Sequence, residues 1–594
     1  MPHAHGSIAA SNTRRPWRRR KGPEPVVELQ PLEERVLFAF HAYITSPQSM
    51  SLAQGTTFSA YVHTTGGLSS SWSVDWGDGS AATPYGSSGT GLLLVSHTYT
   101  TQGSYAVKAT ATSTTSLHDT AVFGLSATFG VSPSQSGETV VTPFGSSGSS
   151  KGNAMAVDHN TGKIYVAGQY STTKFALTRF LSNGSVDTAF GNQAMPGTVS
   201  FSFDTSTDTA LSVAVSGDGS RVAVVGSCST GWAVAVYDMS GQTPVLWQST
   251  ATVWPTGDGP RQAGAKATAV VWDDSDQADD PRIIIAGTDG AGQNVVVATL
   301  VQDFTNGGYI MDTNWGNQGT RGLEIVQACC MCATCAVATS LIEIPLGEQN
   351  TNPSVDKFFV GGYTTNGCCG SCCAQSNFML LRLTPDSDDG GTGQLDTTFG
   401  NNGVVQTNLG SVLGSCASGD QIHSIVEWYD DSTGSYYIDA VGVTNQGSNN
   451  VGLARYSENT GALDTRFGTR GVVRGPAGEA NAATLDGTPF QGFNTEWINN
   501  TGNLVIAGDS SGDFLTARFS NVAVQGGPAA GGLDPTFGNG GVMLTDFGTT
   551  SGNTNDFADG IVINSDGTIV TGGYSGNSIA MAGYNPTDKL IVNP

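Results

Sequence analysis

A short phrase of acidic, aromatic and glycine residues recurs along the chain and constrains the fold more than any other feature. It reads LDTTFGNNGVVQTNLG from Leu395, and close copies begin at Met311, Leu463 and Leu533, with a looser copy at Val186. Sequence phrases repeated in this way are typical of solenoids and propellers, in which each copy belongs to one structural unit. We therefore expect a chain built from similar units that pack side by side.

Each copy lies in a longer unit with two apolar strands separated by a short loop. The first strands, each ending in glycine, cover residues 163–168, 221–226, 282–287, 357–362, 436–442, 503–508 and 568–573. Their partners cover residues 175–180, 232–237, 294–300, 377–383, 450–456, 513–519 and 578–584. An earlier strand precedes each pair, and the recurring phrase supplies a fourth. Four strands in each of seven units predict a seven-bladed β-propeller.

The two ends of the repeat array predict how the ring closes. The last unit ends soon after its third strand, at Tyr584. Residues 126–145, before the first complete unit, look like a corner followed by a fourth strand. We predict that this fragment pairs with the third strand of the last unit, because closure leaves no exposed sheet edge at the seam. Residues 126–594 are thus assigned to the propeller.

The repeat resembles the delta-60 repeat of the DUF5122 β-propeller family. The resemblance covers roughly residues 126–594 and is specific in five units, whereas the second unit has QTPVLWQST in place of the corner. It implies a propeller but no established activity. Within the phrase we expect Asp396 to cap the turn, Phe399 to pack between blades and Gly400 to permit a bend. A phrase used so often around a ring indicates scaffold rather than a single active site.

Residues 41–125 predict a separate, smaller domain of alternating strands. The stretch SVDWGDGS is followed by VSHTYTTQGSYAVKATAT, and together they resemble the signature of a PKD domain. The matching residues are Trp76, Gly77, Asp78, Gly79, His97, Tyr99, Gly103, Tyr105 and Val107. The resemblance implies an immunoglobulin-like β-sandwich that serves as a spacer or adhesion module. Asp75, Asp78 and His97 also suggest a metal or catalytic group, but turn and packing roles are the favoured interpretation.

Composition supports an all-β chain and excludes one class of partner. The chain has 80 glycines and only 12% charged residues, which favours tight turns and short strands over helices. The net charge of −24 repels phosphate backbones, so we expect no nucleic-acid partner. Such a surface suits a secreted protein that stays soluble, or one that binds cations.

Residues 1–40 form a basic N-terminal segment that we expect to be disordered. Their only apolar run, Val36 to Phe40, is too short to span a membrane, and we predict no span elsewhere. The stretch LQPLEERVLFA resembles the LEPR-x-L-L motif of many exported planctomycete proteins, with Glu34 in place of Pro and Phe38 in place of Leu. We therefore expect export to the cell surface or medium; a plain basic tail is the alternative.

Residues with catalytic or metal-binding potential are few in the propeller region. Its only histidines are His159 and His423, and no phosphate loop or nucleophile elbow is present. Asp208, Asp420 and Asp556 precede inner strands and can be placed at the channel mouth as cation ligands, although solvated strand-end acids are the favoured interpretation.

Two acidic runs, DDSDQADD (273–280) and DSDDGG (386–391), suggest calcium loops without a full ligand spacing. We therefore assign no catalytic residue and no cofactor, with calcium or zinc as the alternative.

The cysteines are the most distinctive feature. They are Cys228, Cys329, Cys330, Cys332, Cys335, Cys368, Cys369, Cys372, Cys373 and Cys416. All should lie on one face, since the loops that carry them emerge at the same end of the blades. Disulfides are the default in an exported protein. The C-x-x-C spacings in the two clusters also suit a zinc or copper thiolate site, and a redox role is the third possibility.

The sequence thus predicts an exported, monomeric, non-catalytic surface or matrix protein. It would act in adhesion, binding protein or glycan through the propeller top face. One alternative is a polysaccharide-acting propeller hydrolase or lyase, which the scarcity of histidine disfavours. A second alternative is a metal-binding or redox protein that uses the cysteine cluster.

Overall fold

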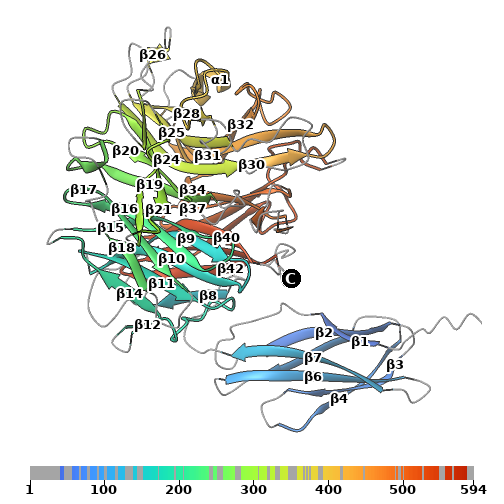
Figure 1. Cartoon of the computed structure of the whole chain (residues 1–594). Coiled ribbons are helices and arrows are strands. Elements are labelled where there is room, and N and C mark those ends of the chain that lie inside the picture. Colours follow the sequence, from blue (N-terminus) through green and yellow to red (C-terminus); the bar gives the residue numbers. More distant parts are fainter. Residues whose placement is uncertain are drawn as a thin grey trace, which may run out of the picture. The chain divides into compact units, whose positions relative to one another are not determined.

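The computed structural model describes most residues between 41 and 584. Gaps of five or more residues lie at 46–56, 128–137, 143–150, 240–244, 274–281, 317–321, 328–334, 345–356, 385–391, 492–496 and 548–554, with shorter gaps elsewhere. The described strands fall into two compact units, one with β1 to β7 and one with the strands from β8 onward (Figure 1). Helix is confined, in the described residues, to η1 (Gly259–Arg261) and α1 (Leu409–Leu413). The chain is therefore all-β, as predicted.

The first unit is a β-sandwich of two antiparallel sheets. One sheet has the order β1-β2-β5 and the other β4-β3-β6-β7. The bounds are β1 His41–Thr45, β2 Thr57–Thr65, β3 Ser69–Asp75, β4 Thr83–Gly89, β5 Leu93–Thr98, β6 Gly103–Ser113 and β7 His118–Ala127. Trp72, Val74 and Trp76 are buried while the residues between them are exposed, which is the period-two pattern of a half-buried strand.

The PKD-like signature residues within the described part have packing roles. Trp76 is fully buried, and its ring stacks on His97 with centroids 4.9 Å apart. The Trp76 Nε1 donates a hydrogen bond to Thr83 Oγ1 at 2.9 Å. Asp75 is exposed, whereas Asp78 and Tyr99 lie outside the described residues. The favoured interpretation of this group, turn and packing rather than catalysis, agrees with these contacts.

In the second unit, we call each run of three antiparallel strands, together with the strand that pairs with the third of them, a blade. The third blade has two such strands, β22 and β23, and a parallel contact between β28 and β30 joins the fourth and fifth blades into one sheet. Blade 1 contains β9 Lys151–Asp158, β10 Lys163–Tyr170, β11 Lys174–Phe180 and β14 Thr198–Phe201. Blade 2 contains β15 Thr209–Val215, β16 Arg221–Cys228, β17 Gly231–Asp238 and β18 Val245–Ser249. Blade 3 contains β19 Lys266–Asp273, β20 Arg282–Thr288, β21 Val295–Gln302 and β22 Tyr309–Met311, and β23 Leu323–Val326 also pairs with β21. The second blade thus has a fourth strand although its sequence lacks the recurring corner.

The remaining blades repeat the same order. Blades 4 and 5 contain β24 Cys335–Ile344, β25 Lys357–Thr365, β28 Ser376–Leu383 and β29 Val404–Thr407; β30 Gly419–Asp430, β31 Ser435–Asn445, β32 Asn449–Ser457 and β33 Val472–Ala477. Blades 6 and 7 contain β34 Glu479–Leu485, β37 Leu504–Ser510, β38 Asp513–Phe519 and β39 Val542–Thr545; β40 Asp556–Ile563, β41 Ile569–Ser575, β42 Ser578–Tyr584 and β8 Glu138–Thr142. Two-residue strands make three small hairpins: β12 Gly191–Asn192 with β13 Met195–Pro196, β26 Cys368–Cys369 with β27 Cys372–Cys373, and β35 Phe490–Gln491 with β36 Trp497–Ile498.

The first strands of the blades follow one another around a ring. Each lies beside the next in the order β9, β15, β19, β24, β30, β34, β40, and β40 lies beside β9 again. The seam is closed by β8, which pairs antiparallel with β42, with Thr142 opposite Ile579 and Glu138 opposite Gly583. This is the pairing that we predicted for residues 126–145. The fold is therefore a β-propeller, as predicted.

The first strand of every blade contains a β-bulge, and the residue of the second strand opposite the bulge is glycine. Opposite each bulge stands the glycine that ends the apolar run seen in the sequence: Gly168, Gly226, Gly287, Gly362, Gly442, Gly508 and Gly573. A Cβ at any of these positions would lie 1.8 to 2.1 Å from a carbonyl oxygen of the first strand. No side chain tolerates such an approach, so the bulge fixes glycine at this position.

Candidate functional site

The recurring corner joins an aspartate, an aromatic ring and an arginine from the third strand of the same blade. In blade 4, Arg382 bonds Asp396 Oδ2 through Nε at 2.8 Å, and its guanidinium lies 4.8 Å from the centre of the Phe399 ring. Asp396 also accepts a hydrogen bond from the Thr398 backbone N–H at 2.9 Å. Phe399 is fully buried among residues of blades 4 and 5, and Gly400 has a φ of +54°. The corner is therefore scaffold, with the roles we expected.

The arginine partner of the corner recurs in other blades and was missed by the sequence analysis. Arg179 pairs with Asp187 at 2.8 Å, and Arg518 with Asp534 at 3.0 Å. Blade 5 differs, because Arg455 there bonds Asp439 instead. The ion pairs of blades 1, 4 and 6 are buried or nearly so, and they hold the corner of these blades against the third strand.

Asp208, Asp420 and Asp556, which we considered as ligands at the channel mouth, are instead fully buried. Each carboxylate accepts a hydrogen bond from a backbone N–H two residues after the fourth strand of the preceding blade. The donors are Phe203 at 2.7 Å, Leu409 at 2.8 Å and Phe547 at 3.0 Å. These aspartates fasten the connection between blades, so their placement as solvated strand-end acids was also wrong.

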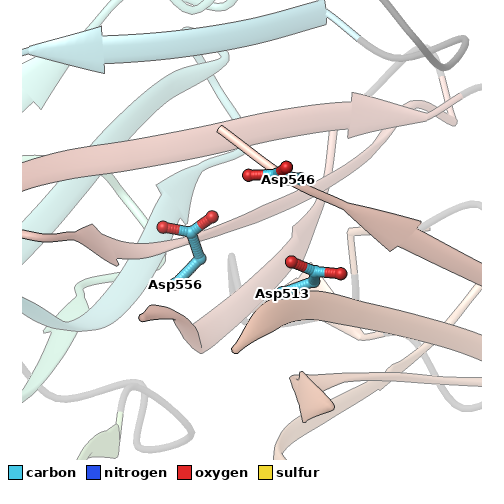
Figure 2. Close-up of side chains that lie close together, drawn as sticks. All are labelled: Asp513, Asp546 and Asp556. Carbon is cyan, nitrogen blue, oxygen red and sulfur yellow. The ribbon is translucent and has the colours of Figure 1, made fainter. Parts of the chain in front are cut away.

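Asp556, one of these buried aspartates, belongs to a group of three acids whose spacing suits a cation. A carboxylate oxygen from each of Asp513, Asp546 and Asp556 lies within 4.8 Å of the others, and Figure 2 shows the three side chains around a common space. Burial, together with the charges of Asp546 and Asp556, raises the pKa of Asp513. Carboxylates also gather at surfaces that bind no ion, so we assign no metal here.

The bulge residues of the first strands form an inner ring that links one blade to the next. They are Asn153, Leu211, Thr268, Thr339, His423, Asn481 and Asp559, all half-buried. Side chains of this ring reach the backbone carbonyl at the bulge of the following blade. Examples are Thr339 to Ile422 at 2.7 Å and Asn153 to Ala210 at 2.8 Å. Most of the ring is therefore a belt of structural hydrogen bonds.

Asp559 is the one acid in this ring. Two other acids near it, Glu479 and Asp509, have no acidic counterpart at the same positions in the other blades. Asn481 Nδ2 donates to Asp559 Oδ1 at 3.2 Å. Glu479 and Asp509 stand directly opposite each other at the start of β34 and the end of β37. Asp509 follows the bulge glycine, where the other blades have Gln, Ser, Thr, Tyr or Val. Asp509 is electrostatically coupled to both Glu479 and Asp559.

An aromatic and basic pair lies next to these carboxyl groups. Tyr574 stands opposite Phe557, with ring centroids 5.0 Å apart, and Lys151 Nζ lies 4.6 Å from the centre of the Tyr574 ring. Lys151 opens the first strand of blade 1, so the group extends over three consecutive blades. We call it the rim cluster and define it as Lys151, Glu479, Asn481, Asp509, Asp559 and Tyr574.

Two carboxyl groups of the rim cluster have pKa values raised close to neutral pH. Burial and then the charge of Asp509 raise the pKa of Asp559 to about 7, against the opposing effect of Lys151. Burial and the charge of Glu479 raise the pKa of Asp509 to about 6. Burial and both aspartates raise the pKa of Tyr574 to about 12. Perturbed ionisable groups gathered in one place are typical of functional sites.

Neither histidine of the propeller supplies a base of ordinary strength. Burial lowers the pKa of His159 to about 4, although the neighbouring Asp158 opposes the shift. Burial likewise lowers the pKa of His423, whose Nδ1 lies 3.0 Å from the Ala480 carbonyl oxygen. Both rings are thus neutral at pH 7, and His423 has the linking role of its ring neighbours.

The predicted cysteine and calcium-loop residues are described only in part. Cys335 begins β24, and the strands β26 and β27 place four more cysteines in the loop between β25 and β28. Cys228 is buried, with its sulfur 3.5 Å from the Gly231 carbonyl oxygen. The other cysteines (329, 330, 332 and 416), the acidic runs 274–280 and 386–391, and residues 1–40 lie outside the described residues. Of the acidic runs, Asp273 is buried at the end of β19.

Comparison with known families matches both units. The family described as "Domain of unknown function (DUF5122) beta-propeller" matches residues 159–190, and the PKD domain family matches residues 42–123. The chain joins a β-sandwich that resembles a PKD domain to a β-propeller. No curated protein sequence shows significant similarity to this PKD–propeller chain. Within the described residues, no helix has the length and hydropathy needed to cross a membrane.

Solved structures resemble the PKD–propeller chain only distantly. Drosophila Semaphorin 2a is 10% identical with a TM-score of 0.39, covering 74% of each chain. The Dos1 propeller is 11% identical with a TM-score of 0.36, covering 74% of this chain and 94% of its own. The GH93 α-L-arabinofuranosidase of Fusarium graminearum is 8% identical with a TM-score of 0.33, covering 63% and 93%. At these levels no function is transferred.

Proposed function

We propose that the protein is exported and non-catalytic, and that it binds a protein or glycan at the cell surface or in the matrix through the rim cluster. The observation that carries the proposal is the contrast between repeated and unrepeated residues. Corner aspartates, bulge glycines and ring amides recur from blade to blade with the same structural task. The carboxyl groups of Glu479, Asp509 and Asp559 have no such counterparts at their positions.

The composition of the rim cluster suits a hydroxyl-rich or polar ligand. Its carboxylates accept hydrogen bonds from hydroxyl groups, while Asn481 and Lys151 donate them. The half-buried ring of Tyr574 offers an aromatic surface with a polar end. A few convergent polar groups beside an aromatic ring are the usual make-up of a small binding site.

Export is supported by the domain content and by the N-terminal segment. PKD domains are typical of extracellular proteins, and residues 42–123 of this chain match that family. Residues 29–39 resemble an export motif. A sandwich that serves as a spacer, followed by a ligand-binding propeller, is consistent with an adhesive surface protein.

The polysaccharide hydrolase or lyase is the second candidate, and one observation favours it. Asp509 and Asp559 hold protons close to neutral pH, as general acids do in glycoside-cleaving enzymes. Buried carboxylates together with arginine would strengthen this alternative. In the described residues, Lys151 lies over the Tyr574 ring, and its charge acts on Asp559.

Binding is tested by presenting the full chain to arrays of glycans and matrix proteins. We expect one ligand class to be retained, and the variants Asp509→Asn and Tyr574→Ala to lose at least tenfold in affinity for it. The matched control for the tyrosine variant is Tyr363→Ala, because Tyr363 has in blade 4 the register position of Tyr574 in blade 7. Equal loss in the control, or unchanged binding in both rim variants, would refute the proposed site.

Catalysis is tested on the same ligands. We expect the full chain to release no reducing ends or unsaturated products from any polysaccharide that it binds. Release that disappears in Asp559→Asn but persists in Tyr363→Ala would replace the binding proposal with the enzymatic one.

A further inference from the structure

The acids of the rim cluster differ from the corner acids in what neutralises them. The corner aspartates of blades 1, 4 and 6 each lie within 3.0 Å of an arginine nitrogen of their own blade. In the described part of the chain, no lysine, arginine or histidine forms such an ion pair with Glu479, Asp509 or Asp559. The fold thus supplies a paired cation to its scaffold acids but not to these three.

Glu479 and Asp509 are placed so that one cation can neutralise both. They stand directly opposite each other on β34 and β37, which puts both side chains on the same face of blade 6. Like charges in this arrangement destabilise a sheet. Asn449 Nδ2 donates to Glu479 Oε1, but a neutral amide leaves the charge in place. A positive group bound between the two acids would remove their repulsion.

The spacing of the rim acids suits an organic cation better than a metal ion. Among the described residues, only Asp513, Asp546 and Asp556 bring three carboxylate oxygens within 4.8 Å of one another. The rim acids are more widely spaced, so a single metal ion cannot bind all of them. A lysine ammonium has three donors and an arginine guanidinium has five, which lets either group bond two separate carboxylates.

The rim cluster already holds one ammonium group of this chain. Lys151 Nζ lies 4.6 Å from the centre of the Tyr574 ring, a cation–π arrangement, and its charge acts on Asp559. Lys151 therefore serves the part of the cluster that contains Asp559. The pair of Glu479 and Asp509 remains for a cation from outside.

We propose that the partner at the rim cluster is a protein segment whose lysine or arginine side chain pairs with Glu479 and Asp509. This inference rests on the binding function proposed above and names the chemistry of the ligand. The net charge of −24 attracts basic partners and repels acidic ones. An uncharged glycan would neutralise neither acid, so the charge balance favours a basic protein.

Binding of a lysine or arginine side chain should weaken on acidification. The charged and titratable groups around Asp509 are Lys151, His423, Glu479, Asp559 and Tyr574. Asp509 and Asp559, with pKa values of about 6 and about 7, gain protons as the pH falls from 8 to 5. Tyr574, with a pKa of about 12, stays neutral, and burial lowers the pKa of His423, so the two aspartates titrate first. Each proton gained removes a charge that attracts the partner.

The test is calorimetric titration of the full chain with oligo-arginine, oligo-lysine and oligo-citrulline peptides of equal length, at an ionic strength that screens distant charges. Citrulline has the shape of arginine without its charge. At pH 8 we expect a basic peptide to bind at least about tenfold more tightly than the citrulline peptide, and to lose this advantage at pH 5. Asp509→Asn should lose the same factor. The matched control, Asp431→Asn, removes an equal charge from an exposed turn between β30 and β31 and should bind as the wild type does.

Equal binding of the citrulline and arginine peptides, or equal loss in Asp431→Asn, would overturn the inference. So would an uncharged glycan whose retention depends on Asp509 while the basic peptides fail to bind; this result would keep the rim cluster as the binding site. The proposed function itself fails only if no ligand of the chain depends on the rim cluster. The peptide comparison uses the wild-type chain, so it holds even where a variant does not fold.

Discussion

Aspartate has three distinct roles in this molecule, and the neighbours of each carboxyl group decide which one it has. Asp396 lies beside Arg382 and Thr398, whose hydrogen bonds and charge lower its pKa despite burial. Asp420 is fully buried and bonds a backbone N–H and Thr444. Burial and the charge of Asp509 raise the pKa of Asp559. The first two aspartates stabilise the fold at neutral pH, whereas the charged form of Asp559 destabilises it.

The raised pKa values predict that these carboxyl groups reduce the stability of the folded chain as the pH rises, and that Asp559→Asn removes part of this loss. Between the ordinary carboxyl pKa of 3.8 and the raised values of about 6 for Asp509 and about 7 for Asp559, the folded chain binds more protons than the unfolded chain. Their contribution to stability is therefore complete below pH 4 and is lost as the pH rises through 7. Calorimetry should find Asp559→Asn a few degrees more stable than wild type at pH 8 and equal to it at pH 4. A constant difference at all pH values would contradict this assignment.

Arg455 and Asp439 form the most buried ion pair of the described residues. Their side chains are each only 1% exposed, with two hydrogen bonds of 2.6 and 2.7 Å, and the guanidinium lies 3.9 Å from the centre of the Trp428 ring. Arg455→Met should cost about 3–5 kcal/mol in the free energy of unfolding, because it leaves Asp439 buried and unpaired. The double variant Arg455→Met/Asp439→Leu should recover most of the loss in urea titrations. No recovery would mean that packing of the guanidinium, and not the pair, carries the effect.

At the scale of elements, strand patterns could be predicted well because their signals are local. Alternation, terminal glycines and the D-x-x-F-G corner are read within a few residues, and they gave the strands, the corner and the closing segment. The arginine of the corner was missed, because Arg382 precedes Asp396 by a whole connection and their pairing appears only when strand and corner meet.

The local sequence did not predict which residues are buried by contacts between different blades. Asp208 was expected at an exposed strand end, but the connection from the preceding blade covers it. The rim cluster was missed because its members come from three blades. A position-by-position alignment of the units would have shown Asp509 after the bulge glycine and Asp559 at the bulge as exceptions.

The pairing of bulge and glycine gives a prediction at this scale. Gly508→Ala would place a Cβ 1.9 Å from the Glu479 carbonyl oxygen, so β34 or β37 must shift. The cost should be about 1–3 kcal/mol, as for other overpacked sites, measured by chemical denaturation of the propeller. Gly86→Ala in the sandwich is the control, since nothing lies within 4 Å of its added Cβ. Equal effects in both variants would disprove the steric account.

At the scale of the whole molecule, the seam of the ring depends on a strand from the beginning of the propeller. β8 contributes residues 138–142 to a blade whose other strands lie beyond residue 556, so the ladder with β42 fastens the two ends of the ring. A proline within β8 removes a backbone donor and disrupts the ladder.

Val140→Pro in the full chain should therefore accelerate hydrogen exchange in β42 and lower the melting temperature by several degrees. Val140 stands opposite Met581, in the middle of the ladder. Val140→Ala keeps the backbone donor and should leave exchange in β42 close to that of the wild type. Slow exchange in both variants would mean that β8 does not close the ring.

The central claim is that repeated residues hold the ring, whereas the unrepeated carboxyl groups of the rim cluster are retained for binding at a cost to stability. The most direct test is the melting temperature, at pH 8, of two variants with the same chemical change. Asp396→Asn loses a carboxylate with a lowered pKa and should melt below the wild type, while Asp559→Asn should melt above it. If Asp559→Asn instead melts below the wild type, as Asp396→Asn does, the rim cluster is part of the scaffold and the claim is wrong.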